Sequence, residues 1–93
     1  MKAIWNNQVI AESDETIIIE DNHYFPPDSV KMEYLKKSGN TYQCHWKGHA
    51  DYYDVTVEGE VSKDGAWIYP EPTEAAKEIA GYYAFWHGVE VTE

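Results

Sequence analysis

The sequence predicts a mainly β protein, with about seven or eight short antiparallel strands and one short helix. Three observations favour this class. Runs rich in β-branched and aromatic residues alternate with turn residues along the whole chain. The turns recur at the regular spacing that is typical of sandwiches and barrels. Only residues 73–80 repeat apolar side chains at helical spacing, which excludes a fold of alternating strands and helices.

The N-terminal third predicts a hairpin followed by a strand. Asn6-Asn7 tolerates positive φ, so residues 3–5 and 9–11 are expected to pair through this turn. Residues 16–20 are rich in β-branched side chains, which favours a strand. Because Ile17-Ile18-Ile19 cannot alternate between two faces, we expect both faces of that strand to be covered.

The middle of the chain predicts irregular structure and then a turn. Pro26-Pro27 prevents regular strand pairing, and residues 27–30 favour a single helical turn. Residues 32–35 favour a strand, although a short helix fits the same residues. The segment Ser38-Gly39-Asn40 is typical of a turn, after which residues 41–44 are expected to form the next strand.

The C-terminal half predicts further strands around the short helix. Asp64-Gly65 is a hairpin signal, with Ser62 and Lys63 in the same expected turn. Thr73 is expected to cap the helix, and Gly81 to end it in the left-handed conformation. The expected strands cover residues 53–58, 66–69, 82–86 and 89–91.

Length and charge limit the classes of partner. The 93 residues suffice for one domain, so residues 1–93 are interpreted as a single domain. Seventeen acidic residues against seven basic ones give a net charge of −10, so we expect no nucleic acid and no membrane partner. The sequence shows no transmembrane run and no apolar export signal, and a single cysteine cannot form an internal disulfide. These features favour a cytoplasmic protein.

Residues 42–53 concentrate the reactive side chains. They include Cys44, the only cysteine, with His45, Lys47 and His49 nearby. A catalytic thiol needs a neighbouring cation or histidine that lowers its pKa, so Cys44 is a candidate catalytic residue. Strand alternation would place Cys44 and His45 on opposite faces, however, which favours a buried structural cysteine.

Neither a metal site nor a cofactor is predicted. Cys44, His45 and His49 are close in sequence, but their spacing matches no zinc pattern and paired Cys-x-x-Cys knuckles are absent. Lys47-Gly48 is expected on a turn. There the lysine would either meet a small anionic ligand or lie exposed, paired with Asp51 or Glu71.

Aromatic residues with polar tips concentrate in three segments, around residues 23–25, 42–53 and 67–72. Aromatic walls with a few polar groups are typical of small-ligand sites, and equally of a small aromatic core. If the segments converge, they form an aromatic-lined pocket. The candidate ligand-binding residues are His23, Tyr24, Trp46, Lys47, Tyr53, Trp67, Tyr69 and Trp86.

Four segments together resemble a known family. They are Asn-His-Tyr-Phe-Pro-Pro at 22–27, Cys-His-Trp-Lys-Gly at 44–48, Ala-Trp-Ile-Tyr-Pro-Glu-Pro at 66–72 and Ala-Phe-Trp-His-Gly-Val-Glu-Val at 84–91. Their order and spacing are similar to those of the domain of unknown function 427 family. The resemblance implies two antiparallel sheets in a tent-like sandwich or open barrel, similar to methionine sulfoxide reductase B, with one short helix near 73–80. It implies no particular reaction. One departure is His45, where the family often has proline.

We therefore expect a small cytoplasmic β-domain that binds a small ligand in the aromatic-lined pocket. Whether the pocket also carries an enzymatic activity stays open. Two alternatives remain from the same residues. One is a protein–protein interaction or homodimerisation module without a small ligand. The other is an enzyme, hydrolytic or redox, that depends on Cys44.

Overall fold

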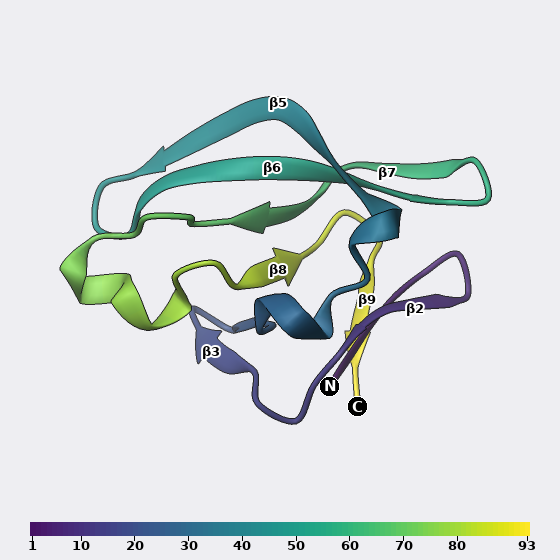
Figure 1. Ribbon diagram of the computed structural model, residues 1–93, viewed down its shortest axis with the longest axis horizontal. Helices are drawn as coiled ribbons and strands as arrows, with labels where there is room; N and C mark the ends of the chain where they lie inside the picture. The colour runs from purple at the N-terminus through teal and green to yellow at the C-terminus, as the bar shows by residue number, and fades with distance from the viewer.

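Nine β-strands in antiparallel sheets make up the structure, a computed structural model that describes residues 1–93 (Figure 1). Strands account for 56% of the chain, and the only helices are short 3₁₀ segments. The sheets form an open sandwich rather than a closed barrel, which confirms the predicted mainly β class. A small third sheet, made by residues 17–24, accompanies the two larger ones.

The strands divide as follows. The three-stranded sheet has the order β2 (Gln8–Glu12), β1 (Lys2–Trp5), β9 (Glu90–Thr92). The two-stranded sheet pairs β3 (Ile17–Ile19) with β4 (Asn22–Tyr24). The four-stranded sheet has the order β5 (Leu35–Cys44), β6 (Gly48–Val57), β7 (Glu60–Ile68), β8 (Tyr83–Phe85). The 3₁₀ segments are η1 (Pro27–Ser29), η2 (Met32–Tyr34) and η3 (Glu74–Ile79).

Alternate residues of β7 and β8 enter two different cores. Trp67 pairs directly with Ala84, and both belong to one buried cluster. The next pair, Ile68 and Tyr83, belongs to the other cluster. This division follows from the pleat, which sends successive side chains to opposite faces of a sheet. Both faces of this part of the four-stranded sheet are therefore covered.

The two cores have different neighbours. The first joins the four-stranded sheet to β1 and β2 through residues such as Ala3 and Ile10. We call the second the aromatic core, because tyrosine and tryptophan dominate its volume. It lies against β3, β4 and η3. Its buried members are Tyr24, Cys44, Ala50, Trp67, Tyr69, Ala76, Ile79 and Ala84.

Several local predictions are confirmed. Asn6 and Asn7 have φ of 50° and 65° and form the turn between β1 and β2. The helical turn after Pro26 is η1, and the short-helix alternative for residues 32–35 is the correct one, as η2. Gly81 takes the left-handed conformation, with φ of 77°, just after η3.

Two predicted turns are wrong, because both segments are bulges inside long strands. Residues 38–40 lie within β5, where they oppose Tyr52 alone. Residues 63–65 lie within β7, where they oppose Asp54 alone, and Asp54 accepts a 2.8 Å hydrogen bond from the Asp64 backbone N–H. An extra residue in one strand is accommodated by a bulge when pairing continues on both sides. The hairpin between β6 and β7 instead turns at residues 58–59, with positive φ at both positions.

Two further expectations need correction. Ile18 is exposed while Ile17 and Ile19 pack against the aromatic core, so β3 is covered on one face only. The segment after Thr73 is a 3₁₀ segment rather than an α-helix, and no side chain caps it. Thr73 does not cap this segment, because its hydroxyl donates instead to the backbone carbonyl of Trp46.

The helical segments of the structure are all short. The longest helical segment is η3, at six residues. Nothing helical in the structure combines the length and the apolar character that a membrane span requires.

Candidate ligand pocket

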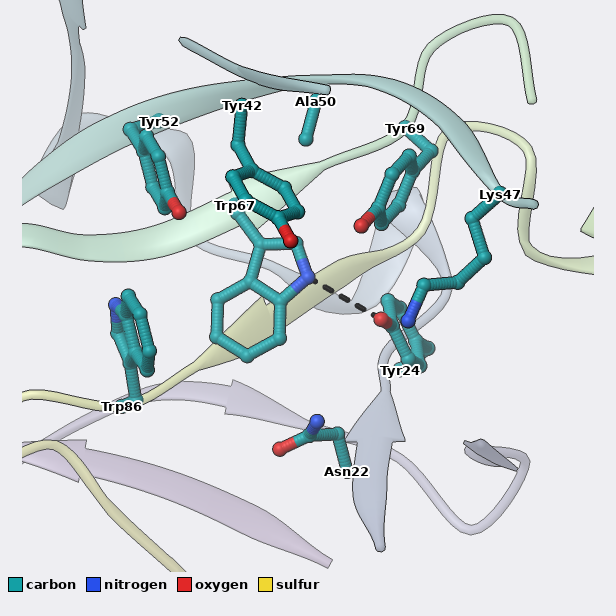
Figure 2. A pocket seen from close by; sticks show the side chains of 9 residues that line it. All are labelled: Asn22, Tyr24, Tyr42, Lys47, Ala50, Tyr52, Trp67, Tyr69 and Trp86. Atoms are coloured by element: carbon teal, nitrogen blue, oxygen red, sulfur yellow. Dashed lines mark hydrogen bonds between the residues drawn. The ribbon is translucent and has the colours of Figure 1, made fainter. Parts of the chain in front are cut away.

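A pocket of about 320 Å³ opens on the face of the four-stranded sheet that carries Trp67 (Figure 2). This volume falls at the small end of the range for pockets that hold small molecules. Seven of its nine lining residues are hydrophobic, and most of these are aromatic. The lining residues are Asn22, Tyr24, Tyr42, Lys47, Ala50, Tyr52, Trp67, Tyr69 and Trp86.

Strand register brings the pocket's residues from three neighbouring strands onto one face. Tyr42 of β5 lies opposite Ala50 of β6, and Tyr52 of β6 lies opposite Trp67 of β7. Directly paired residues point to the same face of a sheet, and residues two apart on a strand share that face. The small side chain of Ala50 leaves the space that the surrounding rings enclose.

The indole of Trp67 forms the floor of the pocket. In Figure 2 its face is turned toward the viewer, with Tyr52 and Trp86 on one side and Tyr69, Tyr24 and Lys47 on the other. The Trp67 and Trp86 ring centroids are 5.1 Å apart, and the ring planes meet at 66°. The Tyr52 and Trp86 rings are parallel, at 6.1 Å between centroids, so they extend one wall.

Hydrogen bonds fix the two indoles. The N–H of Trp67 donates to the hydroxyl of Tyr24 at 3.2 Å, and this bond is buried. The N–H of Trp86 donates to the backbone carbonyl of Asp64 at 2.6 Å, in the β7 bulge. Both indole N–H groups are therefore satisfied within the protein, which leaves the ring surfaces as the part available to a ligand.

Lys47 is the only charged side chain that lines the pocket. It is 6% exposed, and its ammonium donates a hydrogen bond to the carboxylate of Glu20. The ammonium also lies 5.1 Å from the ring centroid of Trp46 and 5.6 Å from that of Tyr69. Of the two expectations for this residue, the exposed lysine paired with Asp51 or Glu71 is corrected, because Lys47 is buried and pairs with Glu20. The other expectation, contact with a small anionic ligand, stays a prediction. A buried ammonium requires a paired anion, and the turn between β3 and β4 supplies it.

The pKa values of this ion pair agree with its geometry. Burial acts to lower the pKa of Lys47, but the hydrogen bond and charge of Glu20, with the charge of Tyr24, raise it overall. The hydrogen bond from Lys47 and its positive charge lower the pKa of Glu20. Both groups therefore stay ionised across the neutral range.

The turn between β5 and β6 delivers Lys47 to the pocket. Gly48 has φ of 109°, a conformation that side chains rarely allow, and it follows Lys47 directly. The backbone N–H of Thr73 donates to the carbonyl of Lys47 at 3.0 Å, so the segment before η3 holds the turn in place. The turn thus points its lysine back toward Tyr24 (Figure 2).

The tyrosine hydroxyls near Lys47 stay protonated at neutral pH. Burial raises the pKa of Tyr69 well above its usual value, and charges on Tyr24 and Cys44 add to the rise. Burial also raises the pKa of Tyr24, more than the Trp67 hydrogen bond and Lys47 lower it. Both hydroxyls thus keep their protons and are able to donate to a polar group on a ligand.

Comparison with known protein families shows to which family this chain belongs. The family described as Domain of unknown function (DUF427) matches residues 1–93, which is the whole chain. The chain belongs to the DUF427 family. This confirms the resemblance seen in the sequence motifs. No curated protein matches the sequence.

Five of the eight predicted ligand-binding residues of this DUF427 domain line the pocket. They are Tyr24, Lys47, Trp67, Tyr69 and Trp86. The other three lie elsewhere. His23 faces Thr16, with 2.9 Å between its Nδ1 and the threonine hydroxyl, and Trp46 packs at the edge of the aromatic core. Tyr53 packs edge-on against Tyr83 in the other core, at 5.4 Å between ring centroids.

The pocket also contains residues outside the predicted ligand-binding set. These are Asn22, Tyr42, Ala50 and Tyr52. Tyr52 and Tyr53 are adjacent on β6 and point to opposite faces, so only Tyr52 lines the pocket. Trp67 and Tyr69 are two residues apart, so the sequence alone indicates that both rings point to the same face. Which residues of β6 lie beside these rings follows only from the register between β6 and β7.

Cys44 is not among the residues that line the pocket. It is buried in the aromatic core, whereas His45 is exposed on the turn that follows β5, so strand alternation does not extend to this pair. Burial acts to raise the pKa of the Cys44 thiol, but backbone N–H groups of Lys47 and Trp46 offset this, and the net pKa is lowered. His49 is adjacent to Ala50 on β6 and therefore points to the face opposite the pocket, with 3.2 Å between its Nε2 and Oδ1 of Asp51. No three histidine, cysteine, aspartate or glutamate side chains come together as metal ligands.

Proposed function

We propose that this DUF427 domain binds a small molecule, with a flat or compact apolar body, against the indole face of Trp67. The observation that carries the proposal is an aromatic pocket of about 320 Å³ whose floor and walls come from β4 and the four-stranded sheet. A site of this kind buries apolar ligand surface while a few polar groups fix its orientation. The low charge of the pocket and the acidity of the chain fit a cytoplasmic small-molecule site.

Two features support a ligand site over a solid core. Trp86 and Tyr42 keep 41% and 53% of their surface exposed at the rim, although large aromatic rings gain from burial. The polar groups turned inward are the Lys47 ammonium, the Asn22 amide and the tyrosine hydroxyls. A ligand placed on Trp67 would meet ring faces first and these polar groups at the margins.

A fragment screen tests the proposal. Binding would be followed by tryptophan fluorescence and by protein-observed NMR, in wild type, in Trp86→Ala and in Met32→Ala. Met32 is 42% exposed, nearly the same as Trp86, and lies outside the pocket, so it is a matched control. We expect fragments that bind wild type and Met32→Ala to bind Trp86→Ala at least several-fold more weakly. Equal binding to all three proteins would contradict this pocket assignment.

A module for protein–protein interaction is the second candidate, because the exposed rings of Tyr42 and Trp86 also suit a protein partner. The free edge of β5 is a poor site for strand pairing. Lys36 and Lys37 are exposed on it, and the bulge at residues 38–40 interrupts it. Self-association through the exposed rings of the pocket face is tested by light scattering at millimolar protein. A dimer that Trp86→Ala disrupts would favour this candidate over the small ligand.

A further inference from the structure

One end of the pocket is lined by ring faces, and the only cationic side chain in the lining, Lys47, lies elsewhere. Tyr52, Trp67 and Trp86 meet there, with centroid separations of 5.1 Å between the two indoles and 6.1 Å between Tyr52 and Trp86. Figure 2 shows Lys47 at the opposite end, beyond Tyr69. The faces of aromatic rings carry partial negative charge, so a corner of three rings attracts a positive group. We call this place the three-ring corner.

The groups around the three-ring corner include Asp64, on whose carboxylate Lys63 and His87 also act, and the His87 imidazole stacks on the Trp86 ring at 4.1 Å between centroids. The backbone carbonyl of Asp64 accepts the Trp86 N–H, which places this acidic residue beside the corner. Hydrogen bonds from Ser38 and Asn40 are the main causes that lower the pKa of Asp64, so its carboxylate is ionised. Burial and then the charge of Asp64 raise the pKa of Tyr52. One acidic carboxylate therefore lies beside the corner, on a chain whose net charge of −10 favours cationic over anionic ligands.

We propose that the ligand carries an organic cation, with methyl groups on its nitrogen, and that this group occupies the three-ring corner. The proposal rests on the proposed function and names the chemical class of the ligand. Its charge complements the ring faces and the Asp64 carboxylate. Lys47 does not oppose it strongly, because Glu20 neutralises that ammonium.

We expect the nitrogen of the ligand to be methylated because the three-ring corner lacks hydrogen-bond acceptors for N–H groups. The N–H groups of a bare ammonium need acceptors, and an unmade hydrogen bond is costly in a partly buried site. The corner presents ring carbons, while both indole nitrogens are already bonded within the protein. A methylated nitrogen has fewer or no N–H groups and spreads its charge over methyl groups, which also gain from contact with the rings.

A pair of probes of equal shape tests the charge. Choline and its neutral analogue 3,3-dimethylbutan-1-ol differ only in having nitrogen or carbon at the centre of the methyl groups. We expect choline to bind about tenfold more tightly, which corresponds to about 1.4 kcal/mol. Titrations would follow the indole N–H signals by NMR. Equal or tighter binding of the neutral probe overturns the cation proposal, and so does no binding of either at millimolar concentration.

Two charge variants test the effect of charge in opposite directions. Glu20→Gln leaves the Lys47 charge unpaired, so choline binding should weaken by several-fold. Lys47→Met removes that charge and leaves the exposed Glu20 carboxylate, so choline binding should strengthen. Thermal melts would first establish that both variants are folded. If the two variants change choline affinity in the same direction, the electrostatic argument is wrong.

Failure of the cation proposal is distinguishable from failure of the proposed function. A fragment library contains neutral, anionic and cationic compounds. If neutral fragments bind at Trp67 and Trp86 while choline does not, the pocket is a ligand site of another class. If no fragment of any charge binds there, the proposed function itself is contradicted.

Discussion

Replacing Tyr24 with phenylalanine removes one oxygen from the wall of the pocket. Tyr24 is fully buried, and its hydroxyl is the acceptor for the N–H of Trp67. Leaving a buried donor unpaired costs about 1–3 kcal/mol, and the neighbouring pocket admits water that lessens the loss. We therefore expect Tyr24→Phe to lower the free energy of unfolding by about 1–2 kcal/mol. In a domain of this size each kcal/mol lowers Tm by about 4–8 °C.

Tyr42→Phe is the matched control for this change. It deletes the same oxygen from the same pocket, but Tyr42 is exposed at the rim. Such a surface change should alter stability by no more than about 0.5 kcal/mol. Urea denaturation of both variants gives the comparison. A double-mutant cycle with Trp67→Phe should also give a coupling energy of about 0.5–1.5 kcal/mol. If Tyr24→Phe is as stable as Tyr42→Phe, the buried bond does not hold the pocket floor.

Three further predictions concern the turn that carries Lys47. The pKa of Glu20 is lowered from 4.5 and that of Lys47 is raised from 10.5, so their pairing stabilises the fold between these values. Wild type should exceed Glu20→Gln in urea midpoint at pH 7, and the difference should vanish as acid protonates Glu20. Gly48→Ala forces a side chain into a strained conformation 3.4 Å from the Thr73 backbone, so its free energy of unfolding should fall by about 1–3 kcal/mol. Cys44 is buried, so iodoacetamide should label it slowly until denaturant is added, and rapid native labelling would instead favour a thiol-dependent reaction.

The fold class was predictable because most of its signals are local. Asn6-Asn7 and Gly81 occupy the conformations that their side chains allow, and the β-branched runs form strands. The two failed turns had equally strong local signals, at residues 38–40 and 63–65. There the pairing of long strands continued past the turn residues and converted them into bulges. Local sequence propensity cannot predict these bulges, because they depend on pairing with strand residues that are distant in sequence.

The sequence predicts the aromatic composition of the candidate site, but it does not predict which side chains enter the pocket or which residue pairs with Lys47. Rings in three segments do converge, but the phase of β6 sends Tyr52 rather than Tyr53 into the pocket. The partner of Lys47 was not predictable, because Glu20 lies 27 residues away on another hairpin. Asn40 and Asp64 likewise join the two bulges at 2.9 Å across 24 residues. Contacts of this kind arise from sheet register and from the docking of separate hairpins.

Protein-observed NMR on the fragment screen tests the central claim most directly. The chain has four tryptophans, and each gives a separate indole N–H signal. Those of Trp67 and Trp86 lie at the pocket, while the indole of Trp5 donates to the carbonyl of Glu60 outside the pocket. The account predicts fragments that shift the first two signals in a saturable way and leave Trp5 unchanged. A screen in which no fragment moves Trp67 or Trp86, or in which Trp5 moves equally, would contradict a ligand site at this pocket.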